Sequence, residues 1–237
     1  MQKGYGKLYL IPNYLAEDNS ENFIPEYVRE QVHHLKHFIV ETEKDARALI
    51  KKLKISTPQN ELTIILWNEH SDKNTVHELI KLLENANNVG IISDAGLPCV
   101  ADPGNDIVAL AHKKNIDVIP LPGSSSIFMA LMASGMNGQS FVFHGYLPIE
   151  KIERAKKIKH IELDAAAKNQ SQIFMEAPYR NNQLLEDIFK TCLSETKLCI
   201  ASNISSTNQL IKTKSIKDWR ISKPDLHKKP TIYIIGN

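Results

Sequence analysis

The sequence predicts an α/β protein with two α/β domains, and three observations carry this prediction. First, short apolar runs alternate with helical stripes of apolar residues along most of the 237-residue chain, as in βαβ units with parallel strands. Second, the stiff stretch Pro120–Gly123 cannot be helical, which divides the chain into domains at 1–120 and 121–237. Third, β-prone runs dominate from Leu198 onward. We therefore expect a mostly parallel N-terminal sheet and a mixed C-terminal sheet.

In the N-terminal domain, strands are expected where a short apolar run ends at a turn signal. The first run ends at Pro12, and the fourth breaks at Ser93–Gly96. Apolar residues at helical spacing predict one helix through 76–86 and another that includes 107–111. The expected strands lie at 8–11, 38–40, 62–66, 89–92 and 118–119.

In the C-terminal domain, helices and strands are expected in a less regular order. Helical patterns cover 124–134 and 152–167, and a third helix carries Leu184, Leu185, Ile188 and Phe189. The expected strands lie at 141–143, 173–175, 198–201, 209–212 and 231–235.

Composition and charge narrow the classes of protein to which this chain could belong. No apolar run is long enough to span a bilayer and no signal peptide is recognisable, so we expect no membrane partner and a cytoplasmic location. The three cysteines form no CxxC pair, which suits a reducing compartment better than a disulfide framework. A net charge of +2 does not by itself indicate a nucleic-acid partner.

The segment GIISDAGLPCVADPG, residues 90–104, leaves the fourth expected strand through a turn rich in glycine and proline. Ligands of open α/β sheets bind at the carboxyl ends of the strands, which is where this turn falls. Glycine lets the backbone approach a ligand closely, and the Asp94 carboxylate can accept hydrogen bonds from ribose hydroxyls or an amine. Further along, Asp102 and Pro103 are expected to be the N-cap and first residue of a helix.

A second turn of this kind, Gly123–Ser126, opens a helix directly after the expected fifth strand. Unpaired backbone N–H groups at a helix start suit a carboxylate or a ring nitrogen, although the serines can equally serve only as helix caps. The phosphate-binding patterns GxxxxGK[ST] and GxGxxG are both absent from the sequence. The two turns together predict a nucleoside-type cofactor.

Three stretches carry a resemblance to the tetrapyrrole methylase superfamily. They are SDAGLPCVADPG at 93–104, PLPGSSS at 120–126 and GYLP at 145–148, while LYLIP at 8–12 and FMEAPYR at 174–180 fit at weaker points. Within the superfamily, the chain is most similar to the branch that methylates ribose 2'-hydroxyls of small-subunit ribosomal RNA. The resemblance covers nearly the whole sequence and identifies the chain as a divergent member.

The resemblance implies two α/β domains of the tetrapyrrole methylase type, with S-adenosylmethionine (SAM) in a cleft between them, in a homodimer. It also implies a SAM-dependent methyltransferase acting on small-subunit ribosomal RNA, so the expected partner is ribosomal RNA or the small ribosomal subunit. By position, the family's cofactor contacts would fall on Pro12, Ser93, Asp94, Leu97, Ser125, Ser126, Glu176, Ile204 and Thr231.

Several positions depart from the pattern of this branch. The segments concerned belong to the substrate side of the expected cleft, so cofactor binding is better supported than ribosomal RNA as the substrate. Two alternatives therefore stay open: a methyltransferase acting on a tetrapyrrole or another small molecule, and a SAM-binding module that has lost transfer activity. The departing segments are Asn13–Glu17, Glu41–Lys44, Ser202–Ser206 and Lys229–Pro230.

Methyl transfer from a sulfonium to a hydroxyl needs positioning, and it benefits from a general base or an oriented cation. Glu41 and Arg180 are the candidate catalytic residues, with Glu176 beside them, because they match or flank family positions. A surface ion pair or a contact at a helix start is an equally open interpretation of each.

Two further patterns bear on partners. Lys151, Arg154, Lys156, Lys157 and Lys159 predict a basic helix that either contacts RNA phosphates or is merely a solvated face. His33 and His37 are spaced as metal ligands on a helix would be, but acidic ligands are missing nearby, so no metal site is expected.

Overall fold

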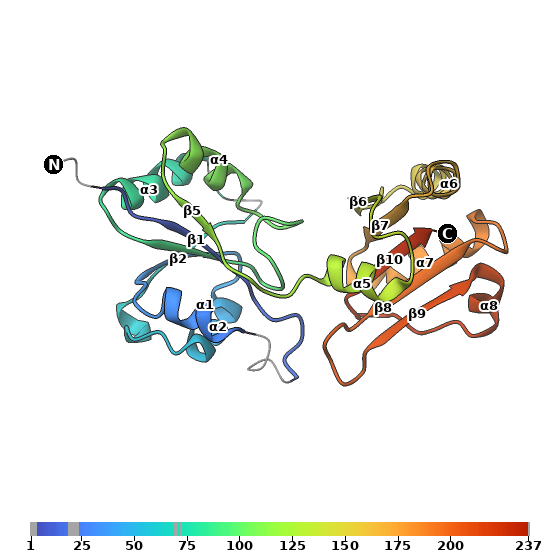
Figure 1. The fold of residues 1–237 in the computed structure, drawn as a ribbon, viewed down its shortest axis with the longest axis horizontal. Coiled ribbons are helices and arrows are strands. Elements are labelled where there is room, and N and C mark those ends of the chain that lie inside the picture. The colour runs from blue at the N-terminus through green and yellow to red at the C-terminus, as the bar shows by residue number, and fades with distance from the viewer. Residues whose placement is uncertain (1–3, 19–23, 69–70, 72, 237) are drawn as a thin grey trace. The chain divides into compact units, whose positions relative to one another are not determined.

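The computed structural model describes residues 4–18, 24–68, 71 and 73–236, with only the backbone described at 73–75. The chain divides into two compact units, Met1–Ser124 and Ser125–Asn237 (Figure 1). The prediction of two α/β halves, one with a parallel and one with a mixed sheet, is confirmed.

Unit 1 is a five-stranded sheet with the strand order β3-β2-β4-β1-β5, and every pairing is parallel. The elements of this unit, in chain order, are β1 (Leu8–Ile11), α1 (Glu26–Val32), β2 (His37–Val40), α2 (Glu43–Leu53), η2 (Gln59–Glu61), β3 (Thr63–Leu66), α3 (Lys73–Glu84), β4 (Val89–Ile92), α4 (Asn105–Lys113) and β5 (Val118–Pro120).

Both faces of this sheet are covered, with α1 and α2 on one face and α3 and α4 on the other (Figure 1). Successive strand side chains point to opposite faces, so Ile11 and Phe38 join one core cluster while Leu8 and Ile39 join the other. All four residues of β4 are buried, which explains why this strand reads as an uninterrupted apolar run.

Unit 2 is a mixed sheet with the order β6-β7-β10-β8-β9, in which only the β6–β7 pair is parallel. Its core cluster joins one face of the sheet to α6, α7 and α8. Its elements are α5 (Ser126–Ser134), β6 (Phe141–Tyr146), α6 (Lys151–Lys168), β7 (Ser171–Met175), η3 (Pro178–Arg180), α7 (Asn181–Thr191), β8 (Lys197–Ser202), β9 (Leu210–Ser215), α8 (Ile216–Ile221) and β10 (Thr231–Gly236).

The structure of the described residues also bears on membrane-spanning helices and on metal sites, neither of which the sequence predicts. Among the helices that the structure describes, none is both long and apolar enough to cross a membrane. Within the same described ranges, no three His, Cys, Asp or Glu side chains gather closely enough to hold a metal ion.

Candidate functional site

The carboxyl ends of β1 and β4 form the topological switch point of unit 1. These strands are neighbours, but the chain leaves β1 towards β2 and leaves β4 towards β5, on opposite sides. Loops that diverge in this way open a crevice at the strand ends, where open α/β sheets bind ligands. Pro12 follows β1 and Ser93 follows β4, so both predicted residues lie at this point.

Asn13 ties the two loops together. Its side-chain amide donates hydrogen bonds to the carbonyls of Ser93 (2.9 Å) and Asp94 (3.0 Å), and its backbone forms an isolated bridge with Gly96. The Ser93 hydroxyl in turn donates to the Gly96 carbonyl at 2.9 Å. Asn13 was treated in the sequence only as a departure from the family pattern, and no local signal revealed this role, because its partners lie about eighty residues away.

The loop after β5 lies against the other two. A β-carbon added to Gly123 would lie only 2.2 Å from the Pro12 Cβ, so the close contact between these loops requires glycine. Gly96 has φ +71°, a left-handed conformation, and an added β-carbon would be 3.5 Å from the carbonyl oxygen of Ser124. Three neighbouring strands, β4, β1 and β5, therefore present their loops side by side.

The Asp94 carboxylate is fixed by Thr42, which follows β2. Thr42 donates its backbone N–H to Asp94 Oδ1 (3.1 Å) and its hydroxyl to Oδ2 (2.6 Å). Thr42 is the N-cap residue of α2, yet its side chain bonds to Asp94 rather than to its own helix. A carboxylate accepts about four hydrogen bonds, so Asp94 keeps capacity for a ligand. Leu97, also predicted, is half-buried in the same loop.

The prediction that Asp102 caps a helix is wrong. The helix α4 begins at Asn105 with Gly104 as its N-cap, at φ 129°. Asp102 instead forms a side-chain hydrogen bond with Glu41, a predicted catalytic residue that follows β2. Burial, then the charge of Glu41 and that hydrogen bond, then the charge of Asp94, raise the pKa of Asp102 to about 8. Two carboxyl groups in such a contact hold a shared proton.

In unit 2, three predicted residues come together where the three central strands of the sheet end or begin. Glu176 follows β7, Ile204 follows β8, and Thr231 begins β10, which runs antiparallel to both strands. The Thr231 hydroxyl lies 3.0 Å from the Ser202 hydroxyl and 2.9 Å from the carbonyl of Lys229. These residues therefore form one cluster in unit 2.

The loop after β8 contains an unusual polar group. Asn203 and Ser205 both have positive φ, at 50° and 72°. The Ser205 hydroxyl is buried and has no hydrogen-bond partner among the described residues. A buried hydroxyl without a partner costs about 1–3 kcal/mol, so it marks a position where a polar ligand group gains stability.

Glu176 holds the other predicted catalytic residue, Arg180. The Glu176 side chain is only 1% exposed, and its Oε1 accepts hydrogen bonds from the Arg180 Nε (3.0 Å), the Arg180 Nη2 (2.6 Å) and the Ala177 N–H (2.7 Å). The hydrogen bond to Glu176 raises the pKa of Arg180 further above its ordinary value. Arg180 is thus a cation in a fixed orientation.

Ser125, at the start of α5, has a structural role. Ser125 is the N-cap residue, and its hydroxyl accepts the backbone N–H of Phe128 at 3.5 Å, while Ser126 is the first helical residue. The capping interpretation of this turn therefore holds for Ser125. The predicted residues divide between the units: Pro12, Glu41, Ser93, Asp94 and Leu97 lie in unit 1, and Ser125, Ser126, Glu176, Arg180, Ile204 and Thr231 lie in unit 2.

The predicted basic helix is only partly a basic surface. Arg154 is 2% exposed and forms a buried ion pair with Asp187 at 2.7 Å, so it cannot belong to a solvated or RNA-binding face. Lys156 pairs with Glu153 and Lys159 with Glu162 on the same helix, α6.

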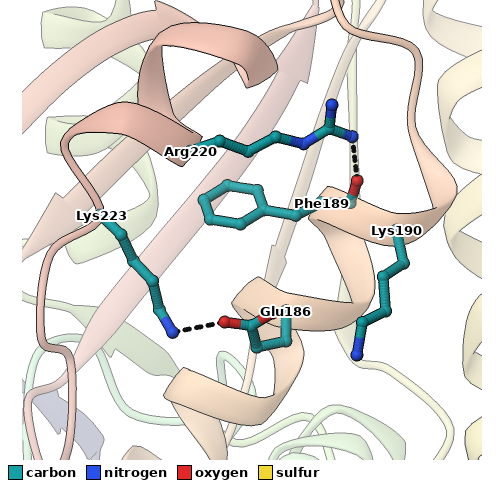
Figure 2. A pocket seen from close by; sticks show the side chains of 5 residues that line it. All are labelled: Glu186, Phe189, Lys190, Arg220 and Lys223. Carbon is teal, nitrogen blue, oxygen red and sulfur yellow. Dashed lines mark hydrogen bonds and ion pairs between the residues drawn. The ribbon is translucent and has the colours of Figure 1, made fainter.

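A pocket of about 420 Å³ lies between α7 and α8 (Figure 2), and none of the residues that line it is a predicted site residue. Arg220 donates to the carbonyl of Phe189 at the end of α7, and Lys223 forms an ion pair with Glu186. Two of the three cations that line the pocket, Arg220 and Lys223, therefore stabilise unit 2 itself. The lining residues are Glu186, Phe189, Lys190, Arg220 and Lys223.

The sequence of this chain is similar to those of known methyltransferases. The family model "Tetrapyrrole (Corrin/Porphyrin) Methylases" matches residues 15–219. Ribosomal RNA small subunit methyltransferase I of Haemophilus influenzae is 30% identical over 70% of this chain and 59% of its own length. The enzyme of the same name from Bacillus subtilis is 33% identical over 76% of this chain and 58% of its own. The chain thus spans somewhat more than half the length of these relatives.

Solved structures share the fold at low sequence identity. The methyltransferase CobJ superposes with a TM-score of 0.66 at 15% identity, covering 99% of this chain and 95% of its own. Cobalt precorrin-4 methyltransferase CbiF gives a TM-score of 0.61 at 15% identity, covering 97% and 94%. With the family model matched along most of its length, this chain belongs to the tetrapyrrole methylase family.

Proposed function

We propose that this protein is a SAM-dependent methyltransferase whose acceptor is a ribose 2'-hydroxyl of small-subunit ribosomal RNA. The observation that carries the proposal is the fixed set of loops after β1, β4 and β5, tied by Asn13 and closed by the contact of Gly123 with Pro12. The names of the relatives from Haemophilus influenzae and Bacillus subtilis support small-subunit ribosomal RNA as the substrate, and the resemblance to the ribose-methylating branch supports the 2'-hydroxyl.

The residues present fit SAM as a cofactor. In unit 1, the loop that holds Asp94 offers a carboxylate to ribose hydroxyls or to the amino group, with its oxygens already oriented by Thr42. In unit 2, the buried Ser205 hydroxyl and the neighbouring Ile204 offer a polar atom and an apolar surface to a purine ring. The remaining cofactor contacts are proposed at Pro12, Ser93, Leu97, Ser125, Ser126, Glu176 and Thr231.

When bound, SAM supplies an electrophilic methyl group on a positively charged sulfur. The acceptor hydroxyl must lose its proton, and the Glu41–Asp102 pair is the candidate base because its shared proton and a pKa of about 8 at Asp102 place proton exchange near neutral pH. Arg180, oriented by Glu176, is the candidate cation that stabilises the developing alkoxide.

The test of this function is methyl transfer to purified small ribosomal subunits from cells lacking the gene. We expect formation of S-adenosylhomocysteine with subunits and none with SAM alone, and a 2'-O-methyl ribose in the ribosomal RNA. Binding of SAM without transfer to any acceptor would instead identify a cofactor-binding module, which the altered segment 202–206 favours. Transfer to a precorrin but not to subunits would identify the small-molecule alternative, which the fold of CbiF favours.

Assembly and location follow from the family in the same way. We propose a cytoplasmic homodimer, with the domain boundary near Pro120–Gly123. Light scattering that shows a monomer at micromolar concentration would contradict the dimer.

A further inference from the structure

Two exposed tyrosines flank Glu176 and Arg180 in unit 2, since Tyr146 pairs with Met175 across β6 and β7 and Tyr179 directly precedes Arg180. Tyr146 ends β6 and is 56% exposed, and Tyr179 in η3 is 63% exposed. Lys228, also exposed, lies beside η3 because its backbone N–H donates to the carbonyl of Pro178 at 2.9 Å. We call Tyr146, Tyr179, Arg180 and Lys228 the tyrosine surface.

The backbone beneath this surface is held rigidly by α7. Asn181 is fully buried; its amide donates to the Lys229 carbonyl at 2.7 Å, and its side-chain oxygen lies 3.2 Å from the Tyr233 hydroxyl. Asn182 accepts the backbone N–H of Leu226 at 2.8 Å. The segment that carries Lys228 is thereby fixed against the start of α7, with Lys228 itself in the left-handed region at φ 57°.

Arg180 contacts the Tyr179 side chain directly. Its guanidinium lies 5.2 Å from the centre of the Tyr179 ring and donates to the Tyr179 hydroxyl at 3.3 Å. Tyr146 lies opposite Met175, the residue before Glu176, in the pairing of β6 with β7. Since Glu176 anchors the guanidinium, the Tyr179 ring lies beside a cation that is held in one position.

We propose that the tyrosine surface binds single-stranded RNA, with Tyr179 and Tyr146 stacking on unpaired bases and Lys228 contacting the adjacent phosphate. This proposal rests on the proposed function, because it assigns the RNA contacts of the same enzyme. Exposed aromatic rings interleaved with cations are the arrangement by which proteins hold unpaired nucleotides, since every base has a face that can stack. In a duplex these faces are covered, so the surface favours single strands.

The test is binding of a fluorescein-labelled oligoadenylate to the full chain, followed by anisotropy at constant salt. We expect Tyr179→Ala to weaken binding by about 5- to 160-fold, as expected for loss of one stacked base. Tyr179→Phe keeps the ring and should bind like wild type. Tyr5→Ala is the matched control, because Tyr5 is 50% exposed but precedes β1, at the other end of the strands from the site loops. Duplex RNA of the same length should bind more weakly than the single strand.

Calorimetric titration with SAM shows that each variant is folded, and it should give the wild-type affinity for Tyr179→Ala. The proposal is overturned if Tyr179→Ala binds the single strand as wild type does, or if Tyr179→Phe loses as much affinity as Tyr179→Ala. Tighter binding of a porphyrin than of oligoadenylate, with the same dependence on Tyr179, would also overturn it. Methyl transfer to subunits is measured separately. If transfer occurs and neither transfer nor RNA binding depends on Tyr179, only the RNA-binding role of the tyrosine surface is overturned. If RNA binding depends on Tyr179 but no transfer occurs, only the proposed methyltransferase function is contradicted.

Discussion

Removing one partner of the buried ion pair between Arg154 and Asp187 should strongly destabilise unit 2. Their side chains are 2% and 7% exposed, and the Arg154 Nε and Nη2 both donate to Asp187 Oδ2, at 2.9 and 2.7 Å. The Nη1 of Arg154 donates to the carbonyls of Pro148 and Ile149. The pair therefore joins α6 to α7 and also anchors the loop that follows Tyr146.

Asp187→Asn keeps the shape of the side chain and removes its charge, which leaves a buried guanidinium without a counter-ion. Removing one partner of a buried pair costs about 3–5 kcal/mol, and because the asparagine oxygen still accepts a hydrogen bond we expect about 3 kcal/mol. With a urea dependence of about 1–3 kcal/mol per molar, the unfolding midpoint should fall by about 1–3 M.

The assay is urea unfolding followed by the fluorescence of Trp219, which is buried in the core of unit 2. The chain has two tryptophans, so a Trp67→Phe background leaves Trp219 as the sole reporter. Glu195→Gln is the control, because the Lys217–Glu195 pair is exposed and is worth at most about 1 kcal/mol. If Asp187→Asn lowers the midpoint no more than Glu195→Gln does, the reasoning about burial is refuted.

Three further predictions address the site and the RNA. Asp94→Ala should weaken SAM binding, measured by calorimetry, by about 1.5–3 kcal/mol, which is the contribution of a charged hydrogen bond. Asp117→Ala is the control, because Asp117 is an exposed aspartate before β5 and its loss should leave the affinity for SAM unchanged. If Asp94→Ala binds SAM as tightly as the wild type does, the placement of the cofactor is contradicted. Because the folded-state pKa of Asp102 is raised from 3.8 to about 8, the folded state binds the extra proton, so the free energy of unfolding should fall as pH rises from about 4 to about 8. Asp102→Asn should flatten that dependence in urea midpoints measured across this range, and an unchanged slope would argue against the shared proton. In the double variant Lys156→Ala, Lys157→Ala, the slope of log affinity for a ribosomal RNA fragment against log salt concentration should become shallower by about 0.7 for each phosphate that the protein no longer neutralises. The affinity for SAM should stay constant. A slope identical to that of the wild type would exclude these lysines from RNA binding.

The fold could be predicted from local patterns because most strands are short, apolar and closed by turn residues. β1 and β4 lie at the predicted residues, 8–11 and 89–92. β6 extends to Tyr146 rather than ending at 143. The added stretch is irregular, because the register of its pairing with β7 shifts there and Gly145 has a left-handed φ, so no alternating strand pattern marks it in the sequence. The strand order also lay beyond local patterns, because it depends on which strands pair.

Long-range partners explain why parts of the site could not be predicted. Asp102 followed by proline matches a helix cap locally, but Glu41, about sixty residues earlier, competes for its carboxyl group. Arg154 matches a basic face by its spacing, but Asp187 on another helix draws it into the core. In both cases a residue distant in the sequence decides the environment of the side chain, through a hydrogen bond for Asp102 and through an opposite charge for Arg154.

The contacts among the loops after β1, β4 and β5 have a consequence for how the protein is made. Every residue that joins these loops, from Pro12 to Ser124, is translated before unit 2 begins at Ser125. At about 5–20 residues per second, the ribosome needs roughly 6–23 s to add residues 125–237. During that interval the first half has all the sequence it needs to fold and to offer its share of the cofactor contacts, so a free cofactor pool can stabilise the nascent chain before the other half exists.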